Sequence, residues 1–250
     1  MSEPTPVSAD ALADRLRPLL GRALVGFDVD GVLAPIVEHA TEARLTPGVH
    51  DSLARLAEQT EIAILSGRSL GDLEHLFGFP DGVHVIGSHG LEIRGDDGVA
   101  LDPDEQYTFD QLELLGRKAV EAAGDGAWLE YKPASVVVHT RAADPSLAEP
   151  ALDAVGRLAG LVDGGQVKPG HHVVELLARS ASKGEALLAL AHRLGRSPLV
   201  FLGDDVTDED AFALMGDDDD VSVRVGPGRT LAKYRLAGPG DVAELLAHLA

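Results

Sequence analysis

The chain has 250 residues, of which 45% are hydrophobic, so it can form one large or two modest domains with packed cores, and a disordered protein is excluded. Its formal net charge of -20 argues against nucleic acid and anionic lipid as partners. It contains no cysteine, which excludes disulfides, thiolate catalysis and cysteine-ligated zinc.

The first ten residues are polar and acidic, and no stretch reaches the roughly 18 consecutive apolar residues of a membrane span. We therefore expect a soluble cytoplasmic protein that does not bind membranes, and we favour a monomer. Residues 8–17 have apolar positions at helical spacing, with Ser8 or Asp10 as the cap. After an irregular stretch, Thr46 as N-cap and Pro47 as first helical residue predict a second helix.

Between these helices, the apolar run 24–27 predicts a short buried strand that stops at two aspartates. Ligands of open parallel sheets lie beyond the carboxyl ends of the strands. Asp28 and Asp30 are two residues apart, so an extended backbone points both to one side, and Gly31 allows a tight turn. Such a pair suits a hard divalent cation. The alternative is an ordinary polar turn.

A second buried strand, 61–65, also ends in polar residues, Ser66, Gly67 and Arg68. Ser69 then begins a helix, with capping-box spacing to an aspartate three residues later. Hydroxyl, guanidinium and helix amides at one strand end suit an anion, although an ordinary strand-to-helix loop is the alternative.

A third strand, 83–87, leads to His89, which is a candidate site-lining residue or a loop residue. Residues 91–101 predict a hairpin around Gly95 to Gly98.

Beyond this point the pattern becomes helix, strand, strand, twice over. The predicted elements are helices at 107–123 and 147–160, strands 127–132 and 135–141 turned at Pro133, and strands 165–168 and 171–177 turned at Pro169 and Gly170. Strands joined by tight turns are antiparallel, because a parallel pair needs a long crossover. Residues 105–177 therefore form a candidate inserted domain.

The parallel pattern then resumes. Lys183 and Gly184 open a helix, and a fourth buried strand, 199–203, ends at Asp204 and Asp205. The remaining predicted elements are a helix at 206–215, a strand at 221–225 and a helix at 241–249.

These polar clusters resemble the haloacid dehalogenase (HAD) phosphatase superfamily, whose motifs match in order across the chain: DVDGV at 28–32, Ser66, Lys183 and GDDVTD at 203–208. The resemblance implies an α/β fold with a Rossmann-like parallel-sheet core, residues 1–104 and 178–250. It also implies an inserted α/β cap of the C2 type, residues 105–177.

The resemblance assigns four catalytic roles. Asp28 would attack phosphorus and form an aspartyl-phosphate, and Asp30 would protonate the leaving alkoxide and then activate water. Ser66 would hydrogen-bond a phosphate oxygen, and Lys183 would neutralise charge on nucleophile and phosphate.

The resemblance also implies Mg²⁺, with its preference over Mn²⁺ left open. Asp28, the backbone carbonyl of Asp30 and Asp204 would bind the ion, and Asp205 or Asp208 would support it from outside.

Within the superfamily, the chain is most similar to trehalose-6-phosphate phosphatases, through DVDGVLAPI at 28–36, LSGRSLGDL at 65–73, GSHGLEI at 87–93, LEYKPASVVVHTR at 129–141 and GDDVTDEDAF at 203–212. This similarity implies a sugar-phosphate substrate, trehalose 6-phosphate, and sugar contacts from Glu130, Lys132 and Glu175. Charged groups suit hydroxyl recognition, although an ion pair on a sheet surface is the alternative. The other candidate substrate-binding residues are Gly67, Arg68, His89, His139 and Arg141.

The chain departs from the family at two places. Val32 stands where threonine is usual, a change we expect to be tolerated. Leu176, Leu177 and Ala178 follow Glu175 where the family continues with arginine and proline, so Arg179 substitutes from nearby or the pocket accepts a different sugar. The alternatives are a phosphatase of another disaccharide or glycosyl-glycerate phosphate, and a sugar-phosphate-binding regulator without turnover.

Overall fold

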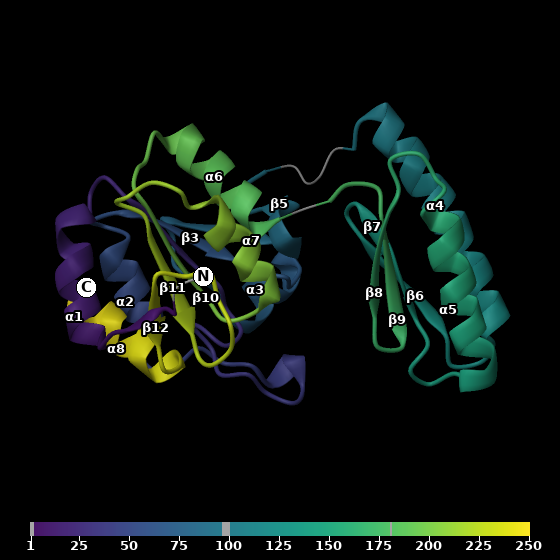
Figure 1. The fold of residues 1–250 in the computed structure, drawn as a ribbon, viewed down its shortest axis with the longest axis horizontal. Coiled ribbons are helices and arrows are strands. Elements are labelled where there is room, and N and C mark those ends of the chain that lie inside the picture. Colours follow the sequence, from purple (N-terminus) through teal and green to yellow (C-terminus); the bar gives the residue numbers. More distant parts are fainter. Residues whose placement is uncertain (1–2, 97–100, 181) are drawn as a thin grey trace. The chain divides into compact units, whose positions relative to one another are not determined.

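The computed structural model of the chain describes residues 3–96, 101–180 and 182–250. It divides into two compact units (Figure 1). Residues 3–96 and 182–250 form what we call the core unit, and residues 101–180 form the cap unit. The predicted insertion, 105–177, lies inside the cap unit. No helix among the described residues is long and apolar enough to cross a bilayer.

The core unit contains an eight-stranded sheet in the order β1-β12-β11-β10-β2-β3-β4-β5. Every pairing is parallel except that of β4 with β5. The strand bounds are β1 Thr5–Pro6, β2 Leu24–Phe27, β3 Glu61–Leu65, β4 Val83–Gly87, β5 Glu92–Ile93, β10 Leu199–Gly203, β11 Val221–Val225 and β12 Tyr234–Leu236.

Helices cover both faces of this sheet (Figure 1). Because side chains alternate along a strand, β2 sends Val25 and Phe27 to one face and Leu24 to the other. The first face packs on α1 Ala9–Leu16, α2 Val49–Leu56, α3 Leu70–Leu76 and α8 Pro239–Leu249. The second packs on α6 Lys183–Leu194 and α7 Val206–Leu214. The short 3-10 turns are η1 Arg17–Leu19, η2 Ala40–Glu42 and η3 Ser88–Gly90.

Strand β2 lies at the point where the strand order reverses. The chain runs from β2 to β3 and β4 on one side, and later returns through β10 to β11 and β12 on the other. In open α/β sheets, the crevice at such a reversal is where ligands bind. The carboxyl ends of β10, β2 and β3 therefore define the expected position of the site.

The cap unit is a four-stranded antiparallel sheet in the order β6-β7-β9-β8, with helices on one face (Figure 1). Leu112, Val136, Val138, Val155 and Leu176 form the centre of its apolar core. No described helix of this unit lies on the other side, which we call the uncovered face. The bounds are α4 Pro103–Ala123, β6 Trp128–Lys132, β7 Ser135–His139, α5 Pro145–Ala159, β8 Gln166–Gly170 and β9 Val173–Leu177.

The predicted α/β fold with a parallel sheet and a second small sheet is confirmed, but two local predictions differ from the structure. Helix α2 begins after Gly48 as N-cap, not after Thr46, because Gly48 takes a left-handed φ of 85°. The turn between β8 and β9 is not at Pro169 and Gly170. Both belong to β8, an edge strand, where proline is tolerated.

The predicted hairpin is a separate case. Strand β5 forms an antiparallel pair with β4 across the Ser88–Gly90 turn, a pairing that the sequence did not indicate. The turn predicted at Gly95 to Gly98 includes residues 97 and 98, which lie outside the described residues.

Candidate active site

The ends of three adjacent strands deliver Asp28, Ser66 and Asp204 to one cavity of about 530 Å³. The other predicted site residues that line it are Asp30, Gly67, Arg68, His89, Lys183 and Asp205. Asp208 is fully buried and reaches the site through Lys183. The structure therefore brings the predicted residues of the core unit together.

Lys183 connects two buried carboxylates. It is the first residue of α6, and its Nζ lies 2.8 Å from Asp28 Oδ2 and 2.9 Å from Asp208 Oδ1. Burial lowers the pKa of Lys183, but the two carboxylates raise it more, so the pKa lies above its ordinary value. Lys183 is thus a fixed positive charge in contact with Asp28.

Asp28 is a buried carboxylate with incomplete charge compensation. Its Oδ1 accepts a 2.6 Å hydrogen bond from the backbone N–H of Val29. Burial raises the pKa of Asp28 well above its ordinary value, and the charge of Asp208 adds to this effect, although Lys183 opposes it. Burial, with Asp208 and Asp205 nearby, also raises the pKa of Asp204 to about 6.

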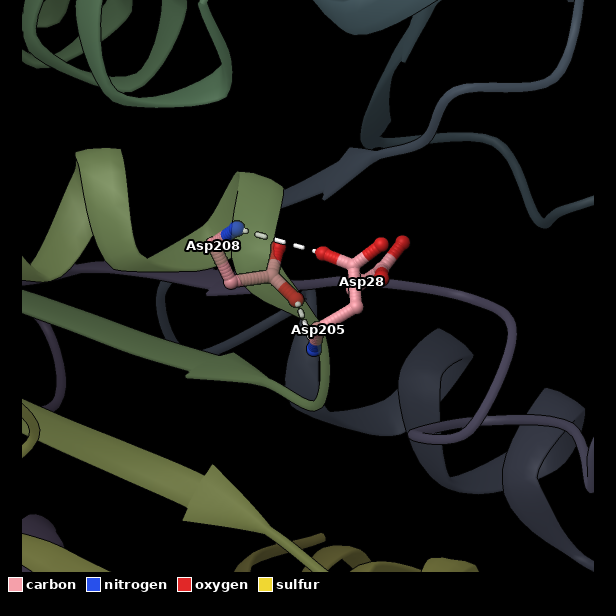
Figure 2. A group of neighbouring side chains, drawn as sticks. All are labelled: Asp28, Asp205 and Asp208. Atoms are coloured by element: carbon pink, nitrogen blue, oxygen red, sulfur yellow. Dashed lines mark hydrogen bonds between the residues drawn. The ribbon is translucent and has the colours of Figure 1, made fainter. Parts of the chain in front are cut away.

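Several carboxylates lie close together at this site. Carboxylate oxygens of Asp28, Asp205 and Asp208 lie within 4.8 Å of one another (Figure 2). Asp205 and Asp208 cap α7 reciprocally, through bonds of 3.0 Å from Asp205 N to Asp208 Oδ2 and 3.3 Å from Asp208 N to Asp205 Oδ1. Asp204 lies against Gly31, where a Cβ would clash with its carboxylate.

The charges lining the cavity fit a divalent cation. Six carboxylates line it, but only two cationic side chains, Lys183 and Arg68, do so among the described residues. An anionic substrate would be repelled by this excess, and hard oxygen donors are the ligands that Mg²⁺ prefers. Among the described residues, the acidic group whose carboxylate oxygens lie within 4.8 Å of one another is Asp28, Asp205 and Asp208. The prediction gave Asp205 and Asp208 a supporting role and made Asp204 a ligand, and Asp204 lines the same cavity.

Arg68 holds Asp30 in a two-point ion pair. Its Nε and Nη2 donate to the two carboxylate oxygens of Asp30 at 2.6 and 2.7 Å. Its Nη1 donates to the Ala40 carbonyl at 2.9 Å, which joins this pair to η2. In this structure the guanidinium therefore orients Asp30, whereas the sequence indicated a contact with substrate.

The loop around Ser66 is held by backbone bonds from the neighbouring strand end. The N–H of His89 donates to the Ser66 carbonyl at 2.9 Å, and the N–H of Arg68 donates to Ser66 Oγ at 3.2 Å. The His89 ring lies directly over Gly67, where a Cβ would come within 2.7 Å of it. Gly67 therefore permits the close approach of His89.

Glu92 is a supporting residue that the sequence did not indicate. Its Oε2 accepts from Ser88 Oγ at 2.5 Å and from the first amide of α3, Leu70 N, at 3.1 Å. Glu92 lies in the motif GSHGLEI, but the sequence gave it no role of its own.

Four predicted sugar-contacting residues share the uncovered face of the cap unit. Glu130, Lys132, His139 and Glu175 lie on this face because of the register of β6, β7 and β9. Lys132 Nζ lies 3.2 Å from Glu175 Oε1, and His139 Nε2 lies 2.7 Å from Glu130 Oε2. Arg141 differs from them, since it is exposed in the turn after β7.

The residues that follow Glu175, where the sequence departs from the family pattern, lie in different parts of the cap unit. Leu176 is buried in the cap core, and Leu177 shares the uncovered face with Glu175. Arg179 Nε donates to Glu105 Oε1 at 2.7 Å, which joins Arg179 to the first turn of α4.

Comparison with known proteins places this site in a family. The model of the trehalose-phosphatase family matches residues 26–239. The chain belongs to the trehalose-phosphatase family. This confirms the resemblance seen in the motifs.

Two kinds of relative support the assignment to the trehalose-phosphatases. A trehalose-phosphate phosphatase of Mycobacterium tuberculosis is 35% identical over 99% of this chain and 66% of its own length, so the chain spans slightly less than two thirds of that relative. A trehalose-6-phosphate phosphatase structure from Aspergillus fumigatus is 26% identical with a TM-score of 0.74, covering 98% of both chains. The C-terminal domain of the Candida albicans trehalose-6-phosphate phosphatase is 25% identical with a TM-score of 0.73, covering 99% of this chain and 98% of that one.

Proposed function

We propose that this chain hydrolyses trehalose 6-phosphate to trehalose and phosphate. The observation that carries the proposal is the buried contact of Asp28 with Lys183 in the strand-end cavity, beside Asp30 and Ser66. The names of the relatives supply the substrate, because they act on this sugar phosphate.

In the first step, a carboxylate oxygen of Asp28 attacks phosphorus, and the bond from phosphorus to the sugar oxygen breaks. Asp30 gives its proton to that leaving oxygen. For this, one of its oxygens must first leave the Arg68 ion pair and take up a proton, while the other oxygen keeps its bond to the guanidinium. In the second step, Asp30 takes a proton from water, whose oxygen attacks the phosphorus of the aspartyl-phosphate. The bond to Asp28 breaks, and phosphate leaves.

Three further residues support these steps. Lys183 neutralises the charge that builds up between Asp28 and the phosphoryl group. Ser66 Oγ accepts a hydrogen bond from the backbone, so its O–H is available to donate to a phosphate oxygen. Arg68 keeps Asp30 in one orientation.

The residues that would hold Mg²⁺ are Asp28, the backbone carbonyl of Asp30 and Asp204, with Asp205 and Asp208 in support. When bound, the ion supplies positive charge that lets an anionic nucleophile approach an anionic ester. The excess of carboxylates lining the cavity supports this assignment.

In this proposal the cap unit contributes sugar recognition. Glu130, Lys132 and Glu175 would bind hydroxyls, since each offers a charged donor or acceptor on one face of one sheet. His139 and Arg141 are further candidates, as are Gly67, Arg68 and His89 in the core unit.

The test measures phosphate release from a panel of sugar phosphates, including phosphorylated disaccharides and glycosyl-glycerates, with Mg²⁺ or Mn²⁺. We expect the highest kcat/KM with trehalose 6-phosphate and loss of release in Asp28→Asn. Asp51→Asn, which changes an exposed carboxylate on α2, is the matched control. Undiminished turnover in Asp28→Asn would refute the nucleophile assignment, and binding without release in wild type would favour a regulator.

A further inference from the structure

The single tryptophan of the chain, Trp128, lies on the uncovered face of the cap-unit sheet. It is 52% exposed, although tryptophan is highly buried on average. Its indole stacks on the His139 imidazole, with ring centroids 4.0 Å apart and planes 6° from parallel. The imidazole covers one side of the indole, and more than half of the residue remains open to solvent.

A fixed arrangement of polar groups surrounds this aromatic pair. Trp128, Glu130 and Lys132 alternate along β6 and so share one face. His139 stands directly opposite Trp128 on β7, and its Nε2–H donates to Glu130 Oε2 at 2.7 Å. Glu130 therefore holds the imidazole against which the indole packs.

This combination suits a pyranose ring. The face of such a ring is made of C–H groups and fits a flat aromatic surface, while its rim carries hydroxyls that both donate and accept. Here the aromatic surface lies beside carboxylate acceptors, Glu130 and Glu175, and an ammonium donor, Lys132. A purely apolar or purely anionic ligand would leave one part of this surface unmatched.

We infer that the indole of Trp128 packs against a pyranose ring of the sugar phosphate, which makes Trp128 a specificity-determining residue. The inference rests on the proposed function for the identity of the ligand. It adds an apolar contact to the charged groups that the sequence indicated.

Fluorescence tests the contact directly, because all tryptophan emission of this chain comes from Trp128. The Asp28→Asn protein with Mg²⁺ is titrated with trehalose 6-phosphate, and quenching by acrylamide is measured at each point. We expect saturable protection of the emission from acrylamide. Inorganic phosphate has no sugar ring and should give no protection. Calorimetric binding of the sugar phosphate without protection would overturn the inference.

Steady-state kinetics supply the second measurement. Trp128→Ala should raise KM about tenfold with little change in kcat, because a contact made equally in ground and transition states affects binding alone. Trp128→Phe keeps a flat ring and should recover most of the loss. Tyr131→Ala is the matched control, since Tyr131 contacts Glu113 of α4 instead of facing the uncovered side. An unchanged KM in Trp128→Ala, or no recovery with phenylalanine, would contradict the inference.

The two proposals fail in different ways. Phosphate release from trehalose 6-phosphate without protection of Trp128 would remove the stacking contact and leave the enzyme activity. Protection of Trp128 in the Asp28→Asn protein, together with no phosphate release by the wild-type protein, would support the stacking contact and remove the phosphatase.

Discussion

Replacing Lys183 with methionine tests whether one buried ammonium organises the site. Methionine is similarly long and unbranched, but it has neither charge nor hydrogen-bond donor. The Lys183 side chain is 2% exposed, and its two carboxylate partners, Asp28 and Asp208, are 6% and 0% exposed. Removing one partner of a buried ion pair leaves an uncompensated charge, which costs about 3–5 kcal/mol.

For a chain of this length, that cost corresponds to a fall in Tm of about 6–20 °C. Typical domains unfold with about 5–15 kcal/mol, so Lys183→Met should still fold at low temperature. Phosphate release should be lost, because no ammonium then neutralises the charge that builds up between Asp28 and the phosphoryl group. Thermal melts with EDTA and release assays with Mg²⁺ measure the two effects separately.

A second substitution in the same chain sharpens this test. Asp208→Asn removes one of the two charges that Lys183→Met leaves unpaired, and the asparagine oxygen can still accept from the amides of Asp204 and Asp205. The double variant should therefore melt higher than Lys183→Met alone, yet remain inactive. Lys118→Met, on the exposed surface of α4, is the control. A wild-type Tm in Lys183→Met, or no gain in the double variant, would refute the reasoning.

Three further predictions follow from particular contacts. Gly31→Ala should lower the affinity for Mg²⁺ measured by calorimetry, because its Cβ would displace the Asp204 carboxylate. Gly48→Ala is the control: its φ is also positive but the space around it is open, so it should lose only about 1–3 kcal/mol of stability and keep its Mg²⁺ affinity. Equal Mg²⁺ affinities of the two variants would contradict this prediction. Arg68→Gln should lower kcat about 10- to 100-fold, because Asp30 loses a charged two-point hydrogen bond; an unchanged kcat would show that Asp30 needs no such support. Burial raises the pKa of Glu175, but the hydrogen bonds that its carboxylate accepts lower the pKa more, so the pKa lies below its ordinary value. The ionised carboxylate therefore stabilises the fold at neutral pH, and this stabilisation is lost as the pH falls through the lowered pKa. The Tm of Glu175→Gln should then fall below that of wild type at neutral pH and converge with it in acid.

The core-unit site could be predicted largely from the sequence because its positions are fixed by strand ends. A buried parallel strand is a short apolar run, and the first polar residue after it must lie at the carboxyl edge of the sheet. Asp28, Ser66 and Asp204 needed no further information to be placed together. The alternation of Glu130 and Lys132 likewise put both on one face before the partner strands were known.

Contacts that depend on side-chain or backbone conformation could not be predicted in this way. The predicted turn at Pro133 already sets Trp128 opposite His139 across β6 and β7, but not the side-chain conformations that bring the two rings parallel. The ion pair of Arg68 with Asp30 joins two loops that local patterns treat separately. Helix α2 begins after Gly48 because that glycine takes a left-handed φ, whereas Thr46 and Pro47 are residues typical of a helix start and so favoured an earlier one.

The position of β2 has a consequence for how the protein is made. The strand that leads into Asp28 lies between β3, which is synthesised soon after it, and β10, which is synthesised much later and places Leu199 opposite Leu24. A nascent or truncated polypeptide that stops before β10 leaves one side of β2 unpaired, and such open edges invite association with other chains. The ribosome must therefore synthesise the chain through β10 before the central strand is paired on both sides, and termination before β10 would leave a product prone to aggregation.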